Sequence, residues 1–205
     1  MYEELKGNNF EIVAAAQDTG GEPAAGKWYD AAKATFTTLI DRQHAVSTAY
    51  NFINVPTGMW IDERGHVVRP AEQAWTSTGE HKYGDRILTK QGEVYVAALR
   101  DWVVKGDRSK YALSDDAYRQ KMKPRSAADM EADASFKLAV WFHDHDNLPL
   151  AAKYWQRAQQ LNPGDWNYAR QDWSFTPGEA DKKWMQKLQG TEKDYQYYPK
   201  LEIPR

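Results

Sequence analysis

Short apolar runs and helically spaced apolar residues alternate along the first seventy positions. A short β-branched run after turn residues is typical of a strand buried on both faces, whereas apolar residues three or four positions apart indicate a helix. Two short runs around a Gly-bearing turn indicate a β-hairpin. The predicted elements are Phe10–Ala16 (strand), Gly26–Thr35 (helix), Thr37–Asp41 (strand), Ala45–Tyr50 (helix), and Met59–Asp62 with His66–Arg69 (hairpin). Ahead of them, residues 2–6 are typical of the end of a helix that stops at Gly7.

The pattern after the hairpin predicts fewer strands and more helices. Residues 71–83 are predicted to be a linker, and 92–104 a helix that ends at Gly106. Ser126, with Asp129 three positions later, predicts a helix start with a capping box. A further helix is expected over 178–188, and the aromatic tail beyond it suits an extended arm lying across a surface.

Residues 132–165 follow the small/large pattern of one tetratricopeptide-like unit. Small residues let two antiparallel helices approach, and two aromatic residues fill the gap between them; they are Ala139, Ala151 and Ala158, with Phe142 and Trp155. The next 34 residues do not repeat the pattern. Because about three repeats are needed for independent stability, we expect a single hairpin docked on the rest of the chain, through the helix at 92–104 and the aromatic tail.

Three segments, Phe10–Asp18, Phe36–Tyr50 and Asn54–Val68, together resemble the thioredoxin fold in its TlpA/ResA-like redoxin branch. The resemblance implies an α/β fold: a thioredoxin-like but incomplete sheet with flanking helices at 1–105, and a helical extension at 106–205. It also implies that the proline of Val55-Pro56-Thr57 is cis and lies beside the active site. In that family the backbone next to this proline pairs with an extended peptide, which makes Val55, Pro56 and Thr57 the expected substrate or peptide-binding residues. The alternative is that Pro56 only shapes its loop.

The chain departs from the family pattern where the chemistry would be. The family has a strand that ends in Trp-Cys-x-x-Cys, followed by a helix that holds the reactive thiolate. This sequence has no cysteine and begins at what resembles the tail of that helix. We therefore expect no catalytic residue in the chain. Either Met1 marks a shortened chain whose parent is a thiol oxidoreductase, or the protein is a natural cysteine-free relative.

Composition narrows the partners and cofactors. The formal net charge of −2 gives no support for a nucleic-acid partner, and no apolar run is long enough to span a bilayer. The cluster His143-Asp144-His145-Asp146 is expected to be a polar helix end, with its two imidazoles on different sides, so neither a metal nor another cofactor is expected. No signal peptide is evident, which favours the cytoplasm by default and the periplasm if the natural start is missing.

Two functions follow as expectations. The first is a redoxin-family protein related to thiol–disulfide oxidoreductases, which is redox-inactive in this chain because it lacks cysteine. The second is a non-catalytic scaffold for a protein or peptide partner, using the cis-proline edge and the helical hairpin. A homodimer that covers an open sheet edge would suit either function, because a missing central strand leaves unpaired backbone groups.

Overall fold

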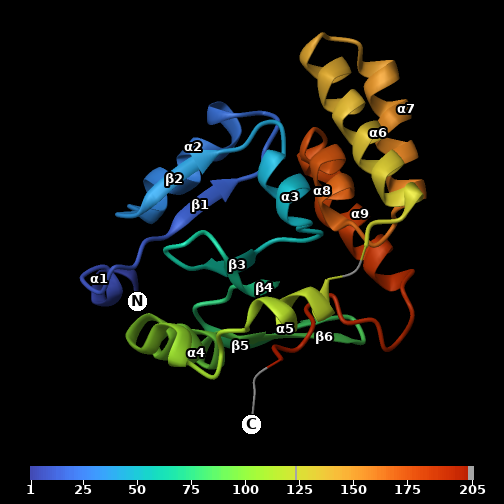
Figure 1. Ribbon diagram of the computed structural model, residues 1–205. Coiled ribbons are helices and arrows are strands. Elements are labelled where there is room, and N and C mark those ends of the chain that lie inside the picture. The colour runs from blue at the N-terminus through green and yellow to red at the C-terminus, as the bar shows by residue number, and fades with distance from the viewer. Residues whose placement is uncertain (123, 203–205) are drawn as a thin grey trace. The chain divides into compact units, whose positions relative to one another are not determined.

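The chain forms two compact units, each built from segments that are distant in sequence. The computed structural model describes residues 1–122 and 124–202 (Figure 1). Unit 1 comprises Met1–Ile12, Pro56–Lys123 and Leu188–Arg205, and unit 2 comprises Val13–Val55 and Pro124–Lys187. Both contain helices and strands, so the expected α/β class is confirmed. The division expected at residue 105 stays a prediction.

Unit 1 contains two antiparallel β-hairpins, helices and the C-terminal tail. Its elements are α1 (Tyr2–Leu5), β3 (Thr57–Ile61), β4 (Val67–Gln73), β5 (Thr78–Tyr83), β6 (Arg86–Gln91), α4 (Gly92–Lys105), the 3₁₀ turn η1 (Gly106–Arg108) and α5 (Asp115–Lys121). The β3–β4 hairpin and the helix that ends at Gly106 agree with the sequence expectation. Helix α5, which Ser114 caps by accepting a hydrogen bond from the backbone N–H of Ala117, was not expected.

An aromatic cluster forms the core of unit 1 where α4 packs on the β3–β4 hairpin. Trp60 of β3 is 3% exposed and stacks on Trp102 of α4, with ring centroids 5.1 Å apart. Its indole N–H donates to the hydroxyl of Tyr95, 3.0 Å away, and the guanidinium of Arg69 lies 5.1 Å from its ring centroid. A single strand residue therefore fixes the helix by both apolar contact and a buried hydrogen bond.

Residues 71–83 are not a linker, and this expectation was wrong. Strand β4 continues to Gln73, and β5 pairs with β6 in a second hairpin from Thr78↔Gln91 to Tyr83↔Arg86. The sequence of β5, Thr-Gly-Glu-His-Lys-Tyr, lacks the apolar alternation that marks most strands, because none of its side chains is fully buried in a core. The turn itself carries a recognisable signal, because Gly84 adopts φ 61° between the paired Tyr83 and Arg86.

Arg86 of β6 holds the start of the C-terminal tail. The guanidinium of Arg86 donates to the backbone carbonyls of Thr191, Glu192 and Lys193 at 2.7–2.9 Å. Further along, Tyr197 is 2% exposed. Residues 190–202 form neither helix nor strand and contain turns at residue 190 and at residues 193–194, so the extended arm stays a prediction; its Ile203-Pro204 part lies outside the described residues.

Unit 2 joins a parallel strand pair to helices from both of its segments. Its elements are β1 (Val13–Ala16), α2 (Glu22–Ala32), β2 (Thr37–Ile40), α3 (Ala45–Tyr50), α6 (Ala127–Asp144), α7 (Leu148–Leu161), α8 (Trp166–Ser174) and most of α9 (Pro177–Gln189). The strand–helix–strand–helix order and α9 agree with the expectation, whereas α8 was not expected.

The strands do not form the one sheet that the thioredoxin-like expectation requires. Among the described residues they pair as three two-stranded sheets, β1–β2, β3–β4 and β5–β6. The first is parallel, with Val13 opposite Thr37 and Ala16 opposite Ile40. Parallel sheets are normally wider than two strands and covered on both faces. Val13 and Leu39 instead remain 62% and 48% exposed.

Helices α6 and α7 form the expected antiparallel hairpin (Figure 1). Ala139, Ala151 and Ala158 are all 0% exposed at the contact, and Trp155 packs among them. Both parts of the Ser126–Asp129 capping box are present at the start of α6. The predicted packing within 132–165 is therefore observed, while its relationship to tetratricopeptide repeats stays a prediction.

Candidate functional site: a polar pocket in unit 2

The residues expected to bind a peptide do not gather into a site within either unit. Val55 is the last residue of its segment of unit 2, and its backbone N–H donates to the side-chain oxygen of Asn54 at 2.9 Å. Pro56 begins the next segment of unit 1, and Thr57 starts β3 opposite Gln73. The peptide-binding role of Val55, Pro56 and Thr57 therefore stays a prediction.

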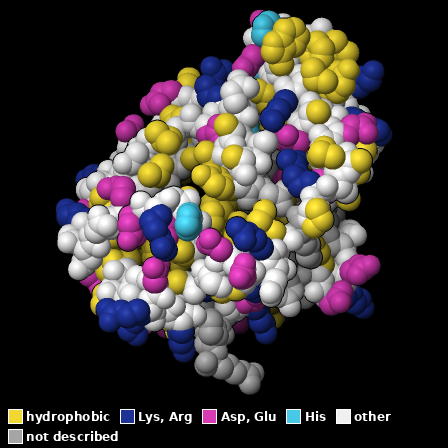
Figure 2. Space-filling model, in the orientation of Figure 1, with side chains coloured by type: hydrophobic (Ala, Val, Ile, Leu, Met, Phe, Trp, Pro, Cys, Tyr) yellow, Lys and Arg dark blue, Asp and Glu magenta, His cyan; other side chains and the backbone are white. Residues whose placement is uncertain are grey.

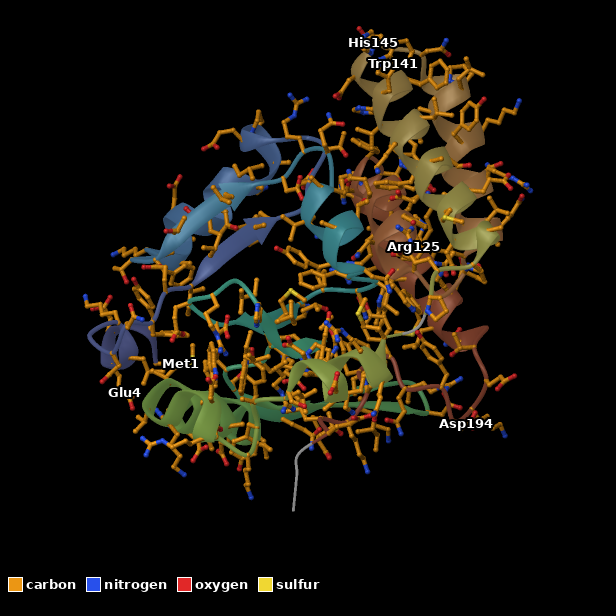
Figure 3. All side chains as sticks on the ribbon, viewed as in Figure 1. Met1, Glu4, Arg125, Trp141, His145 and Asp194 are labelled. Carbon is orange, nitrogen blue, oxygen red and sulfur yellow. The ribbon has the colours of Figure 1, made fainter. Side chains whose placement is uncertain are left out.

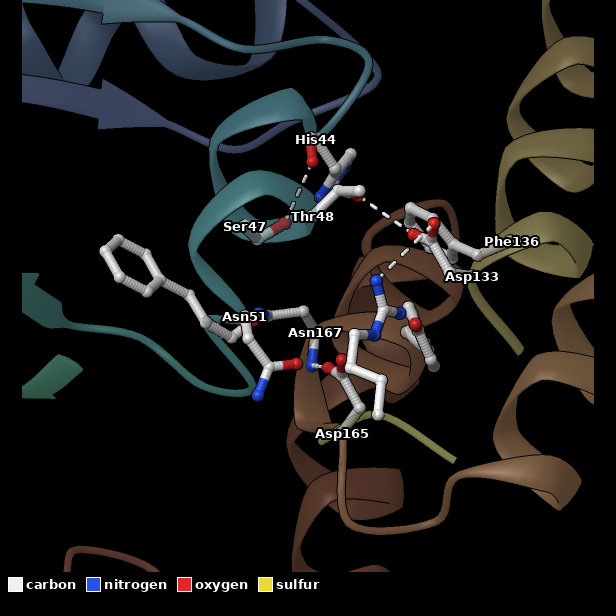
Figure 4. Close-up of a pocket in the computed structure, with 11 residues that line it drawn as sticks. His44, Ser47, Thr48, Asn51, Asp133, Phe136, Asp165 and Asn167 are labelled. Atoms are coloured by element: carbon white, nitrogen blue, oxygen red, sulfur yellow. Dashed lines mark hydrogen bonds and ion pairs between the residues drawn. The ribbon is translucent and has the colours of Figure 1, made fainter. Parts of the chain in front are cut away.

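A polar pocket lies within unit 2 instead, between α3, α6 and the start of α8 (Figure 4). Its enclosed part has room for about one water molecule, which excludes a larger buried ligand. The side chains that line it are His44, Ser47, Thr48, Asn51, Phe52, Arg125, Asp133, Phe136, Asp165, Asn167 and Tyr168.

His44 precedes α3 and is 3% exposed. Its Nε2 lies 2.8 Å from Oε1 of Gln171 on α8, and its ring meets Phe136 of α6 edge-on, with centroids 4.8 Å apart. Burial lowers the pKa of His44 below its usual 6.5, against the opposing effects of the Gln171 hydrogen bond and of the carboxylates of Asp41 and Asp18. The imidazole is therefore neutral at pH 7.

The carboxylate of Asp133 accepts a hydrogen bond from Thr48 and lies near two cations, Lys137 and Arg125. The hydroxyl of Thr48 donates to its Oδ1 at 2.9 Å, and Lys137 Nζ lies 3.0 Å from its Oδ2. The guanidinium of Arg125, which Figure 3 labels, lies 4.0 Å from the same carboxylate, as the dashed line in Figure 4 marks. It also donates to the backbone carbonyl of Asp129. The Nε of Arg125 is buried and has no protein hydrogen-bond partner.

Asp165 is a buried carboxyl group that forms no ion pair with any residue that the structure describes. It is 7% exposed, and it caps α8 by accepting the backbone N–H of Asn167 at 2.9 Å. Burial raises its pKa from 3.8 to about 7, although backbone hydrogen bonds from Asn167 and Tyr168, and the charge of Lys187, act in the opposite direction. Burial also raises the pKa of the neighbouring Tyr168. Close to pH 7 the pocket therefore holds a neutral His44, an uncharged Tyr168 and a partly ionised Asp165.

The hydroxyl groups of the pocket are engaged in hydrogen bonds of the fold. Ser47 donates to the backbone carbonyl of His44 at 3.1 Å, and Thr48 donates to Asp133. Ser47 donates to a backbone carbonyl rather than to a base, and the carboxylate that accepts from Thr48 is itself ion-paired with Lys137. The pocket is suited to holding α3, α6 and α8 together by hydrogen bonds.

Sequence reasoning did not single out this pocket, because its residues come from three distant segments. One local signal was available. Asp165 follows Asn162-Pro163-Gly164 and precedes Trp166, which is the arrangement of a helix N-cap after a turn. That signal would have predicted α8 and placed a carboxyl group at its start.

The imidazoles of the His143–Asp146 cluster turn to different neighbours, as expected. His143 stacks on Phe175 with centroids 4.1 Å apart, and His145 stacks on Trp141 at 4.0 Å (Figure 3). Within residues 1–122 and 124–202, no three His, Asp or Glu side chains are grouped as a metal site.

Comparison with known proteins gives no family for the chain. No family model, no curated protein and no solved structure matches it. In the described part of the chain, every helix is too short or too polar to cross a membrane.

Proposed function

We propose that the chain is a thioredoxin-like, redoxin-family protein related to thiol–disulfide oxidoreductases, and that it is redox-inactive in this form. The observation that carries the proposal is the order of elements around Val55-Pro56-Thr57. The succession β1, α2, β2, α3, Val-Pro-Thr, β3, β4 matches the order that the resemblance implies. Redox inactivity follows from the absence of cysteine, because the thiolate is the reacting group.

An insulin-reduction assay with dithiothreitol tests the chemical part. We expect this chain to give no rate above the dithiothreitol background, and a measurable rate would contradict redox inactivity. The genomic DNA upstream of Met1 tests the relationship. An in-frame strand ending in Trp-Cys-x-x-Cys would support it, whereas a ribosome-binding site preceded by a stop codon would favour a natural cysteine-free relative.

A second candidate, a non-catalytic interaction scaffold, rests on the exposed apolar surface of the helical hairpin. Trp141 is 52% exposed, Leu148 58% and Leu138 43%. Figure 2 shows hydrophobic side chains gathered at the end of the α6–α7 hairpin, close to a histidine. Such a patch is typical of a surface that binds a protein.

Light scattering across a concentration series distinguishes a self-associating scaffold from a monomer. We expect a homodimer if the open edge of β1 pairs with a second copy. The double variant Trp141→Ser, Leu148→Ser separates the two surfaces. A dimer that survives these substitutions does not use the hairpin patch, and one that is lost does.

A further inference from the structure

His44 connects three segments of unit 2 through one amide group. Its Nε2 lies 2.8 Å from Oε1 of Gln171 on α8, and the backbone N–H of Thr19, in the loop after β1, donates to the same oxygen at 3.0 Å. The amide nitrogen of Gln171 donates to Ser174 Oγ at 2.9 Å, which fixes which end of the amide faces the imidazole. Oε1 can only accept hydrogen bonds. The hydrogen of the neutral ring is therefore on Nε2.

The second nitrogen of the ring has no protein partner. Nδ1 of His44 is buried and makes no hydrogen bond in the structure, although its residue lines the pocket. In the neutral ring this atom carries a lone pair and no hydrogen. A proton on Nδ1 would create both a positive charge and an N–H without a protein acceptor. Burying such a group is unfavourable.

The charged groups around the ring do not offset that cost. The carboxylates of Asp18, in the loop after β1, and of Asp41, directly after β2, favour the protonated ring, but the effect of burial is larger. On α6, Asp133 is already held by Thr48 and Lys137. The remaining charges that line the pocket are Arg125, which repels a second cation, and Asp165.

From this geometry we propose that His44 is an acid-sensitive clasp, which holds α8 to α3 and to the loop after β1 only while its imidazole is neutral. A proton on Nδ1 leaves the Nε2–H hydrogen bond to Gln171 in place, but it puts a charge and an unpaired N–H inside the packed pocket. Opening the pocket exposes that charge to water, and α8 is then released. The clasp is closed above pH 6.5, the ordinary pKa of histidine, and is lost as the pH falls below it, because the released state binds the proton more tightly. Asp165 cannot cause this loss, because protonating its buried carboxyl group favours the closed pocket.

Nitrogen NMR of the histidine rings tests the premise on the whole chain at neutral pH. We expect His44 to show a protonated Nε2 and a bare Nδ1. A proton on Nδ1 at neutral pH would overturn the proposal. This measurement needs no variant.

An acid titration of the backbone amide signals tests the release. In the wild type, the signals of α8 should leave their native positions in mild acid before those of α4 in unit 1. His44→Gln keeps an N–H donor for Gln171 and cannot titrate, so it should move the α8 midpoint to a lower pH. His81→Gln, on the exposed face of β5, is the matched control and should titrate like the wild type.

Two outcomes would overturn the clasp. One is an α8 midpoint in His44→Gln equal to that of the wild type. The other is a wild-type titration in which α8 and α4 are lost together at one pH. If His44→Gln does not give a native spectrum at neutral pH, the wild-type ring state and the order of loss decide the question.

Discussion

The carboxyl group of Asp165 accepts a hydrogen bond from the backbone N–H of Asn167, 2.9 Å away, at the first turn of α8. Because the carboxyl group is buried, ionising it has a cost. Its pKa is raised from 3.8 to about 7, so its contribution to stability is fully present below pH 3.8 and is lost as the pH rises through about 7. Asp165→Asn keeps a capping oxygen and removes the charge.

We expect the free energy of unfolding of Asp165→Asn, relative to that of the wild type, to rise by about 4 kcal/mol as the pH goes from about 4 to about 8. Urea denaturation of both proteins across this range measures the change. The pH-dependent contribution of His44 is the same in both proteins and drops out of the difference. Asp129→Asn is the control. Hydrogen bonds from Ser126 lower the pKa of the exposed Asp129, so its replacement should lose stability at neutral pH. A gain in both variants, or in neither, would contradict the assignment.

Removing the hydroxyl of Tyr95 should destabilise unit 1. Tyr95→Phe leaves the indole N–H of Trp60 buried without its acceptor at 3.0 Å. An unsatisfied buried donor costs about 1–3 kcal/mol. Chemical denaturation followed by tryptophan fluorescence measures the loss. Tyr118→Phe, on the half-buried face of α5, removes the same atom and should change the midpoint little. Equal effects of the two substitutions would argue against a role for the hydrogen bond.

The α6–α7 contact should not accept a larger side chain. Ala151 is 0% exposed where the two helices meet, so Ala151→Leu forces them apart and should cost about 1–3 kcal/mol or more. Ala152 is exposed on the same helix, and Ala152→Leu should be close to neutral. Thermal unfolding of the two variants gives the comparison. A stable Ala151→Leu protein would show that the contact can rearrange.

Gly92 cannot carry a side chain without moving the loop between β4 and β5. A Cβ atom at this position would lie 2.3 Å from the backbone nitrogen and carbonyl carbon of Ser77. Gly92→Ala should therefore lose about 1–3 kcal/mol in chemical denaturation. Gly79→Ala, in the adjacent β5, has open space around it and should lose much less. The prediction fails if the two alanine substitutions are equivalent.

Local patterns predicted much of the secondary structure. The run at 10–16, the hairpin around Gly65 and the capping box at Ser126 each depend on neighbouring residues, and each forms near its expected place. The β5 strand has no buried residue, and α8 is a short helix in an aromatic segment, so neither gave a clear period. In both segments the clearer local signal is a turn, at Gly84 in the β5–β6 hairpin and at Pro163-Gly164 before α8.

The pairing of strands could not be predicted in the same way. Val13 to Ala16 has the composition of a buried strand, but composition does not say which strand lies on its other side. The pocket could not be predicted from the sequence either, because its residues are also brought together only by folding. His44 and Gln171 are 127 positions apart, and only the folded chain brings their side chains to 2.8 Å.

The interleaving of the two units has a consequence for synthesis on the ribosome. The chain passes between the units after residues 12, 55, 123 and 187. The segment after residue 187 includes the carbonyl groups that Arg86 holds. Unit 1 can therefore assemble fully only after nearly the whole chain has emerged, and neither unit can be produced alone as one uninterrupted piece of the gene.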